Sequence, residues 1–267
     1  MAKRSKYQAM RADQNGLIPY SAEAHDTWQT LISRQRECVA QYACEEYQHA
    51  LAQLDLPNEQ IPQCKAISEK LYDATAWKVA PVDALISFEE FYHMLANKVF
   101  PAASFIRSCQ ELDYLQEPDI FHEIFGHAPL LMNQRFAEFS HAIGKIGLAA
   151  EPADYSWLAR LYWFTIEFGL IHSAAGPRPY GAGIVSSFTE LPYSIESNTP
   201  KRLPFKLMDV LRTPYRIDAL QTSYFIIDDF EELFELIEQD LLGAIREARR
   251  LGMYGANFPL ACTEHAA

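Results

Sequence analysis

Cysteine and basic residues are scarce in this chain, and both shortages exclude classes of protein. The five cysteines are an odd number and include no CxxC pair, so the sequence predicts neither a disulfide framework nor a thiolate zinc site. Lysine and arginine number 23 against 35 acidic residues, which gives a formal net charge of −12. Nucleic-acid binding depends on basic side chains that neutralise phosphates. We therefore expect a small-molecule partner and no nucleic acid.

The chain also lacks a long apolar run. No stretch approaches the roughly 18 uninterrupted apolar residues of a membrane-spanning helix. The basic residues near the start are not followed by the apolar segment that a signal peptide needs. We therefore expect a cytoplasmic protein with reduced cysteines and no membrane partner.

Helical periodicity, by contrast, is abundant. Hydrophobic residues make up 49% of the sequence, which is enough for a large core. Apolar spacing and capping residues predict helices at residues 21–54, 87–99, 133–148, 154–172 and 229–250. Strand signals are fewer, at residues 183–188 and 223–227.

These patterns predict a mainly α fold, an α+β arrangement with few short strands, in a single compact domain. We expect the domain to span residues 19–255. A flexible N-terminal segment is expected at residues 1–18 and a C-terminal tail at residues 256–267.

Two histidines, His122 and His127, are five residues apart. On an ideal α-helix this spacing turns their side chains about 140° away from each other, so a continuous α-helix cannot aim both rings at one metal ion. Gly126 and Pro129 predict that the helix breaks between them and lets His127 turn back toward His122. Two histidines bonded to carbonyls near a helix end are an equally good interpretation of this pair alone.

Glu167 is the one formally charged residue within residues 161–171. A buried carboxylate without a partner is costly, so such groups are paired, protonated or bound to metal. An Arg or Lys could be the partner, but the two upstream imidazoles favour a metal ion. Two histidines and one carboxylate with open coordination positions form the facial triad of oxygen-activating Fe(II) enzymes.

A zinc hydrolase is the competing interpretation of the same donors. The zinc protease signature places its histidines four apart with a glutamate after the first. Glu123 has the required place, but His127 comes one residue too late. The spacing therefore favours iron over zinc.

At these residues the sequence resembles the catalytic domain of the pterin-dependent aromatic amino acid hydroxylases, and most of all their short bacterial members that act on phenylalanine. The similarity covers roughly residues 19–252. The motifs that carry it lie at residues 118–129, 162–169, 180–188 and 212–217.

The resemblance implies the hydroxylase fold, with Fe(II) held by His122, His127 and Glu167. It implies O2 and a tetrahydropterin as co-substrates and the hydroxylation of L-phenylalanine to L-tyrosine. Tryptophan or tyrosine hydroxylation is the near alternative, and a metal-stabilised binding module without activity is a more distant one. The larger animal members add a regulatory domain and a tetramerisation helix, for which this chain has no length. A monomer or dimer is therefore expected.

The resemblance also assigns residues to the substrate. Arg107 corresponds to the arginine that binds the amino acid carboxylate, and Asp119 to the carboxylate that supports this arginine. Trp163 would wall the substrate ring, Gly183 would let the backbone approach a ligand, and Ser186 would join the hydrogen bonds around iron and substrate. Without the resemblance, Arg107 reads as a surface charge and Trp163 as core.

Two further residues are assigned to the pterin. Phe91 corresponds to a phenylalanine that stacks on it, and Glu123 to a glutamate that contacts it through water. Core packing and a helix-surface charge are the alternatives for these two positions. Leu115 departs from the family pattern, because animal members carry a threonine there, and this puts the contact with the substrate amino group in doubt.

Overall fold

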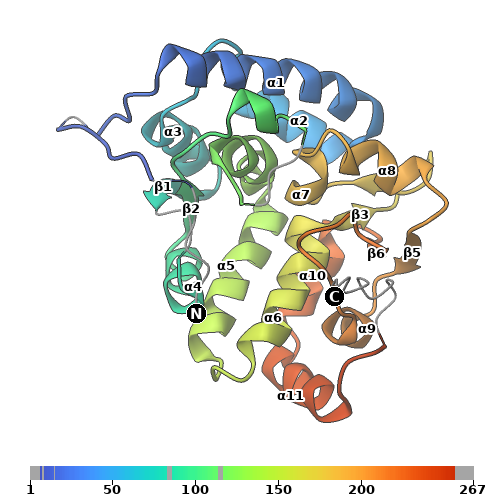
Figure 1. Ribbon diagram of the computed structural model, residues 1–267. Helices are drawn as coiled ribbons and strands as arrows, with labels where there is room; N and C mark the ends of the chain where they lie inside the picture. Colours follow the sequence, from blue (N-terminus) through green and yellow to red (C-terminus); the bar gives the residue numbers. More distant parts are fainter. Residues whose placement is uncertain (1–6, 8, 15, 83–85, 114–116, 256–267) are drawn as a thin grey trace, which may run out of the picture.

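Helices make up more than half of the residues described in the computed structural model, which are residues 7, 9–14, 16–82, 86–113 and 117–255 (Figure 1). The α-helices are α1 (Ala22–Tyr42), α2 (Glu45–Leu54), α3 (Cys64–Thr75), α4 (Phe88–Ala96), α5 (Gln134–Ala149), α6 (Tyr155–Tyr162), α7 (Ala182–Val185), α8 (Glu190–Glu196), α9 (Leu207–Arg212), α10 (Phe230–Ile237) and α11 (Leu241–Leu251). Short helical turns of other kinds are η1 (Cys109–Glu111), η2 (His122–His127), η3 (Pro129–Met132) and η4 (Trp163–Glu167).

Two small sheets complete the described structure. Parallel strands β1 (Lys78–Val82) and β2 (Val99–Ala103) form the first. The second has the order β4-β3-β6-β5 and contains β3 (Gly169–Ile171), β4 (Arg178–Pro179), β5 (Lys201–Pro204) and β6 (Ser223–Ile227). Strand β2 leads toward Arg107 and β3 follows Glu167, so each sheet anchors one side of the region that holds the predicted site.

Helix α5 runs through the middle of the molecule, where it packs against α4 and α10 (Figure 1). Its contact with α4 is unusually close. A Cβ atom at Gly144 would lie 2.3 Å from the backbone nitrogen of Ala96, and one at Gly147 would lie 2.1 Å from the ring of Tyr92. Small residues at these two positions therefore allow α4, which carries Phe91, to approach the core.

The mainly α class with few short strands is confirmed. The predicted Ser87 cap is present, with its Oγ accepting a hydrogen bond from the Glu90 amide at 3.1 Å. Asn133 caps α5 in the same way, through the amide of Phe136. The strand predicted at residues 223–227 is β6.

Three of the long predicted helices are wrong in extent: capping side chains divide two of them, and the third gives way to a strand, although the apolar pattern continues in each. The helix at 21–54 is divided where Cys44 caps α2 through its sulfur. The helix at 229–250 is divided where Asp240 caps α11. The helix at 154–172 stops at Glu167, and residues 169–171 form β3 instead.

The strand predicted at residues 183–188 is also wrong. Residues 183–185 belong to the short helix α7, in which the amides of Ile184 and Val185 both donate to the carbonyl of Gly181, and residues 186–188 form no strand. A short apolar run has the same appearance in a buried strand and in a buried helical turn, so periodicity could not separate the two.

The described part of the predicted N-terminal segment contacts the body of the protein. The Tyr7 ring stacks on Phe105 at a centroid distance of 4.3 Å, and the backbone of Met10 exchanges hydrogen bonds with the Ser104 hydroxyl. The predicted C-terminal tail, residues 256–267, lies outside the described residues. In the part of the chain that is described, no helix has both the length and the apolar character needed to cross a bilayer.

Candidate metal centre

The three predicted metal ligands all lie in π-helical turns. His122 and His127 begin and end η2, and Glu167 ends η4. In such a turn the amide bonds to the carbonyl five residues earlier, as the Ala128 amide does with the Glu123 carbonyl at 3.3 Å. Residues five apart then face the same side. The predicted helix break between the histidines is therefore wrong, because the helix widens at this point and continues.

Gly126 was predicted to turn the chain out of the helix, but its role in the structure is a different one. Its φ is not positive, so it does not turn the chain out of the helix. A Cβ atom there would lie 2.9 Å from the carbonyl oxygen of Ala182. The glycine therefore allows η2 to pack directly on α7, at whose C-terminal end Ser186 lies.

The ligand atoms converge. Nε2 of His122 and Nε2 of His127 are 3.1 Å apart. The Glu167 carboxylate places Oε1 3.1 Å from the His127 nitrogen and Oε2 3.7 Å from the His122 nitrogen. Two atoms that each lie about 2.1 Å from one ion, at a right angle, are about 3 Å apart. The donor set and its spacing therefore fit a single transition-metal ion.

One side of this cluster is accessible to solvent. The side chains of His122 and Glu167 are 16% and 15% exposed, whereas that of His127 is 3% exposed. Within the described chain, the ion pairs of Glu167 are with the two histidines and not with an Arg or Lys. The interpretation of Glu167 as the partner of a basic side chain is therefore wrong.

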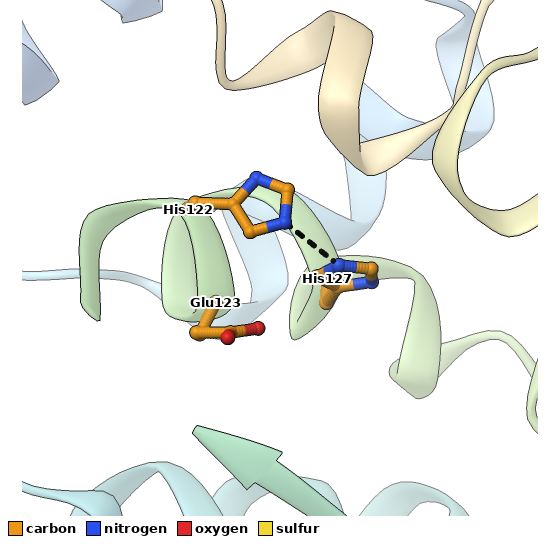
Figure 2. A group of neighbouring side chains, drawn as sticks. All are labelled: His122, Glu123 and His127. Atoms are coloured by element: carbon orange, nitrogen blue, oxygen red, sulfur yellow. Dashed lines mark hydrogen bonds between the residues drawn. The ribbon is translucent and has the colours of Figure 1, made fainter. Parts of the chain in front are cut away.

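A second carboxylate approaches the same histidines. His122, Glu123 and His127 each offer a ligand atom within 4.8 Å of the others, and Figure 2 shows the three side chains on one turn. Glu167 lies nearer to both ring nitrogens. The Glu123 carboxylate accepts a bond from the Ala103 amide, and burial together with the charge of Glu167 raises its pKa well above the ordinary value. Because its oxygens lie 3.1 and 3.7 Å from the histidine nitrogens, we favour Glu167 as the ligand.

The orientation of His122 is set by Ser186. The Ser186 hydroxyl donates to the Ala182 carbonyl at 2.7 Å, so its oxygen accepts from Nδ1–H of His122 at 2.9 Å. With the proton on Nδ1, the lone pair of Nε2 faces the cluster. Burial lowers the pKa of His122 to about 4, although the Glu167 charge acts in the opposite direction. The ring is therefore neutral and ready to bind a metal near pH 7.

We expect Ser186→Ala to weaken metal affinity by about 10- to 100-fold, because the imidazole loses the group that orients it. The measurement is a metal titration of the purified protein against a competing chelator. Ser194→Ala is the matched control, because the Ser194 hydroxyl is equally buried and donates to the Leu191 carbonyl. Equal affinity of the two variants would contradict the role of Ser186.

Glu167 is held by α7 as well as by the histidines. The Gly183 amide donates to its carboxylate. A Cβ atom at Gly183 would lie 2.6 Å from the Phe168 ring, and one at Gly181 would lie 2.4 Å from the Glu167 carbonyl oxygen. Burial raises the pKa of Glu167, but the histidines and this amide outweigh it and leave the pKa below the ordinary value. The carboxylate is therefore paired and not protonated.

Arg107 and Asp119 form a buried ion pair beside the histidines. The Asp119 carboxylate accepts from Arg107 Nε at 2.8 Å, from Nη2 at 2.9 Å and from the Arg107 amide at 3.0 Å. Its Oδ1 also accepts from the His122 amide at 3.1 Å. Burial raises the pKa of Asp119, but the Arg107 guanidinium lowers it by more. The pair therefore ties the arginine to the first turn of η2.

Aromatic side chains line the region around the cluster. Phe91 is half-buried and meets Tyr162 edge to face at 5.3 Å, and the Tyr162 ring is 6.4 Å from His127. Trp163 is half-buried and stacks on Tyr215 at 4.3 Å. The structure thus brings both predicted aromatic residues close to the ligand-bearing turns. Leu115 lies outside the described residues.

Sequence reasoning missed the support of Trp163. Its indole N–H donates to Gln221 Oε1 at 3.1 Å. The Gln221 amide in turn donates to the buried carboxylate of Glu190 at 3.0 Å. Tyr215 belongs to the motif at residues 212–217, and Gln221 follows that motif. Only the fold shows that both residues face Trp163.

The larger cavities do not mark this site. One of about 250 Å³ is lined by Phe164, Tyr215 and Gln221, and another of about 270 Å³ lies between α1 and α3. The void beside His127 measures about 10 Å³. The converging donors therefore mark the site, although the void beside them is small.

The four cysteines within the described residues are free, as expected: Cys38, Cys44, Cys64 and Cys109. Cys262 lies outside the described residues.

Comparison with known proteins agrees with this geometry. Residues 3–241 match the family model described as biopterin-dependent aromatic amino acid hydroxylase. A phenylalanine-4-hydroxylase of Pseudomonas aeruginosa is 49% identical over 96% of this chain and 98% of its own length.

Solved structures are similar along most of the chain. The apo structure of the cold-active phenylalanine hydroxylase of Colwellia psychrerythraea 34H aligns with a TM-score of 0.92 at 46% identity, covering 95% of this chain and 98% of that one. The Chromobacterium violaceum phenylalanine hydroxylase with bound oxidised Fe(III) aligns with a TM-score of 0.87 at 43% identity, covering 91% and 89%.

The fold and the cluster of two imidazoles and a carboxylate define a metal-dependent enzyme of the facial-triad class. The chain belongs to the biopterin-dependent aromatic amino acid hydroxylases. The resemblance inferred from the motifs is confirmed. Membership in this family sets aside the zinc hydrolase and the inactive binding module.

Proposed function

We propose that the protein is a phenylalanine 4-monooxygenase, which hydroxylates L-phenylalanine to L-tyrosine with O2 and a tetrahydropterin. Fe(II) is bound by His122, His127 and Glu167. The observation that carries the proposal is the convergence of these three donors, at 3.1 to 3.7 Å, on a side of the cluster that is accessible to solvent. The shared name of the bacterial relatives supports phenylalanine as the substrate.

When bound, Fe(II) and the reduced pterin together supply the activation of O2 that ring hydroxylation requires. The protein offers the imidazole nitrogens of His122 and His127 and the carboxylate of Glu167 as ligands. Three protein donors leave other positions of an octahedral ion free for small molecules. The chain therefore holds the ion without enclosing it.

Arg107 binds the carboxylate of the amino acid in this proposal. Asp119 accepts hydrogen bonds from Nε and Nη2 of the guanidinium. The arginine keeps further N–H groups at Nη1 and Nη2 for a second carboxylate. Burial strengthens such a bond, because solvent screens it less. With the carboxylate held beside η2, the ring of the substrate extends toward the metal and Trp163 can wall it.

In this proposal Phe91 and Glu123 contact the pterin. The half-buried Phe91 ring is fixed edge-on by Tyr162 and so has an ordered face available for stacking. Glu123 is buried and adjacent to the ligands, so its carboxyl oxygens can bond to the pterin through water. Gly183 and Ser186 act on the substrate side mainly through the ligands that they hold in place.

We expect Arg107→Lys to raise the apparent KM for L-phenylalanine by about tenfold or more with nearly normal iron content. Lysine keeps the charge but cannot offer a planar fork to two carboxylates. Steady-state kinetics and iron analysis of the same preparation measure both effects. Arg135→Lys is the control, because Arg135 pairs with Glu231 on the surface. An unchanged KM would mean that another group binds the carboxylate.

The direct test incubates iron-loaded protein in air with a tetrahydropterin and with phenylalanine, tyrosine or tryptophan in turn. Product identification by mass spectrometry should find tyrosine from phenylalanine, and much less product from the other two. A chelator should abolish the reaction. Turnover of tryptophan or tyrosine in preference to phenylalanine would overturn the substrate, and no hydroxylation of any would overturn the activity.

We further propose that the catalytic domain spans residues 19–255 and that the enzyme is cytoplasmic, which its free cysteines support. It acts as a monomer or dimer. Light scattering coupled to size-exclusion chromatography decides the oligomeric state.

A further inference from the structure

The widened turn between the two histidines has a gap in its backbone hydrogen bonding. The carbonyl of Phe125 would accept from the amide of residue 129 in an α-helix and from the amide of residue 130 in a π-helical turn. Residue 129 is Pro129, which has no N–H to donate, and among the described residues the Leu130 amide does not bond to this carbonyl. A buried carbonyl that lacks a donor is costly, so the position calls for one from elsewhere in the fold.

Tyr47 of α2 supplies it. The Tyr47 hydroxyl donates to the Phe125 carbonyl, and the residue is completely buried. Its ring lies against that of Phe125 at a centroid distance of 6.4 Å. The start of α2 is itself anchored, because the Cys44 amide donates to the Pro179 carbonyl at 3.0 Å. The donor therefore comes from a fixed element and not from a mobile loop.

The residues just before His127 are thus held from two directions. Tyr47 holds Phe125, and α7 packs on Gly126 so closely that no side chain fits between them. His127 follows at once and places its Nε2 3.1 Å from both other ligand atoms. A displacement of this stretch would move the histidine that is nearest to both partners.

We propose that Tyr47 is a positioning residue of the metal centre: its hydroxyl replaces the backbone donor that Pro129 removes and thereby fixes the π-helical turn that aims His127 at the ion. This inference rests on the proposed metal site and extends it to a residue that is separated from His127 by 80 positions of sequence. The alternative is that this hydrogen bond adds only to general stability.

The test compares Tyr47→Phe with the parent protein, using Co(II) as the probe. Phenylalanine keeps the buried ring and removes only the hydroxyl, so the variant should fold, which circular dichroism verifies. We expect Co(II) affinity, measured against a competing chelator, to fall by about 10- to 100-fold, as for other groups that orient ligands. The visible absorption of bound Co(II) should change as well, because it reports ligand geometry.

Tyr224→Phe is the matched control. Tyr224 is also completely buried, and its hydroxyl donates to the buried Glu190 carboxylate, away from the histidines. This variant should lose thermal stability but keep the parent's Co(II) affinity and spectrum. If Tyr47→Phe behaved in the same way as Tyr224→Phe, the positioning role would be overturned. If the parent itself failed to bind Co(II), the proposed metal site would fail, which is a separate outcome.

Discussion

The His127→Ala variant should lose tight Fe(II) binding and with it all hydroxylation. His127 is the ligand that lies 3.1 Å from an atom of each of the other two, so its removal leaves two donors that no longer enclose a position. The loss should exceed the roughly 10- to 100-fold effect of changing a group that only orients a ligand. Iron content after loading and isothermal titration measure it.

Two other histidines provide the comparison. His49 is exposed on α2, and His141 bonds to the Ala96 carbonyl at 3.0 Å, away from the cluster. His49→Ala and His141→Ala should keep iron and activity near the parent values. Normal iron content in His127→Ala would remove it from the ligand set, and a loss shared by all three variants would indicate general misfolding.

Glu167→Gln should separate the charge of the carboxylate from its shape. In the metal-free protein the amide oxygen can still accept from the Gly183 amide and from His127, and the cost of burying a charge disappears. The melting temperature without metal should therefore change little. Iron stabilises the parent because it binds the native state alone. That stabilisation, together with nearly all hydroxylation, should be lost in the variant.

Glu123→Gln decides between the two carboxylates. Because Glu167 lies nearer than Glu123 to both histidine nitrogens, an amide at position 123 should preserve iron binding and the iron-dependent rise in melting temperature. Melting curves of both variants, with iron and with chelator, give the comparison. If Glu123→Gln lost the iron effect and Glu167→Gln kept it, Glu123 would be the ligand.

The sequence was informative where chemistry is local. A lone charge in an apolar stretch identified Glu167. The spacing of the histidines showed that an ideal α-helix could not aim both rings at one ion. The π-helical turns were not predicted, because a pattern search assumes the period of an α-helix and these turns have the wider period of a π-helix. The support by Gln221 and Tyr47 depends on contacts across the fold, which no periodicity reports.

The ends of the helices show a similar limit. Apolar residues continue across the ends of α1 and α10, so hydrophobic spacing alone joins each to the helix that follows. The interruptions depend on single caps, the Cys44 sulfur and the Asp240 carboxylate. A cysteine is not among the residues expected to begin a helix, so this boundary carried no recognisable signal.

Asp119 connects two binding events that the site would otherwise keep apart. One of its oxygens accepts from both the Arg107 guanidinium and the His122 amide, so the group proposed to bind the amino acid and the backbone of a proposed metal ligand share one carboxylate. A free energy that passes between two sites is the same in both directions. If bound amino acid changes the affinity for the ion by some factor, then the bound ion must change the affinity for the amino acid by the same factor.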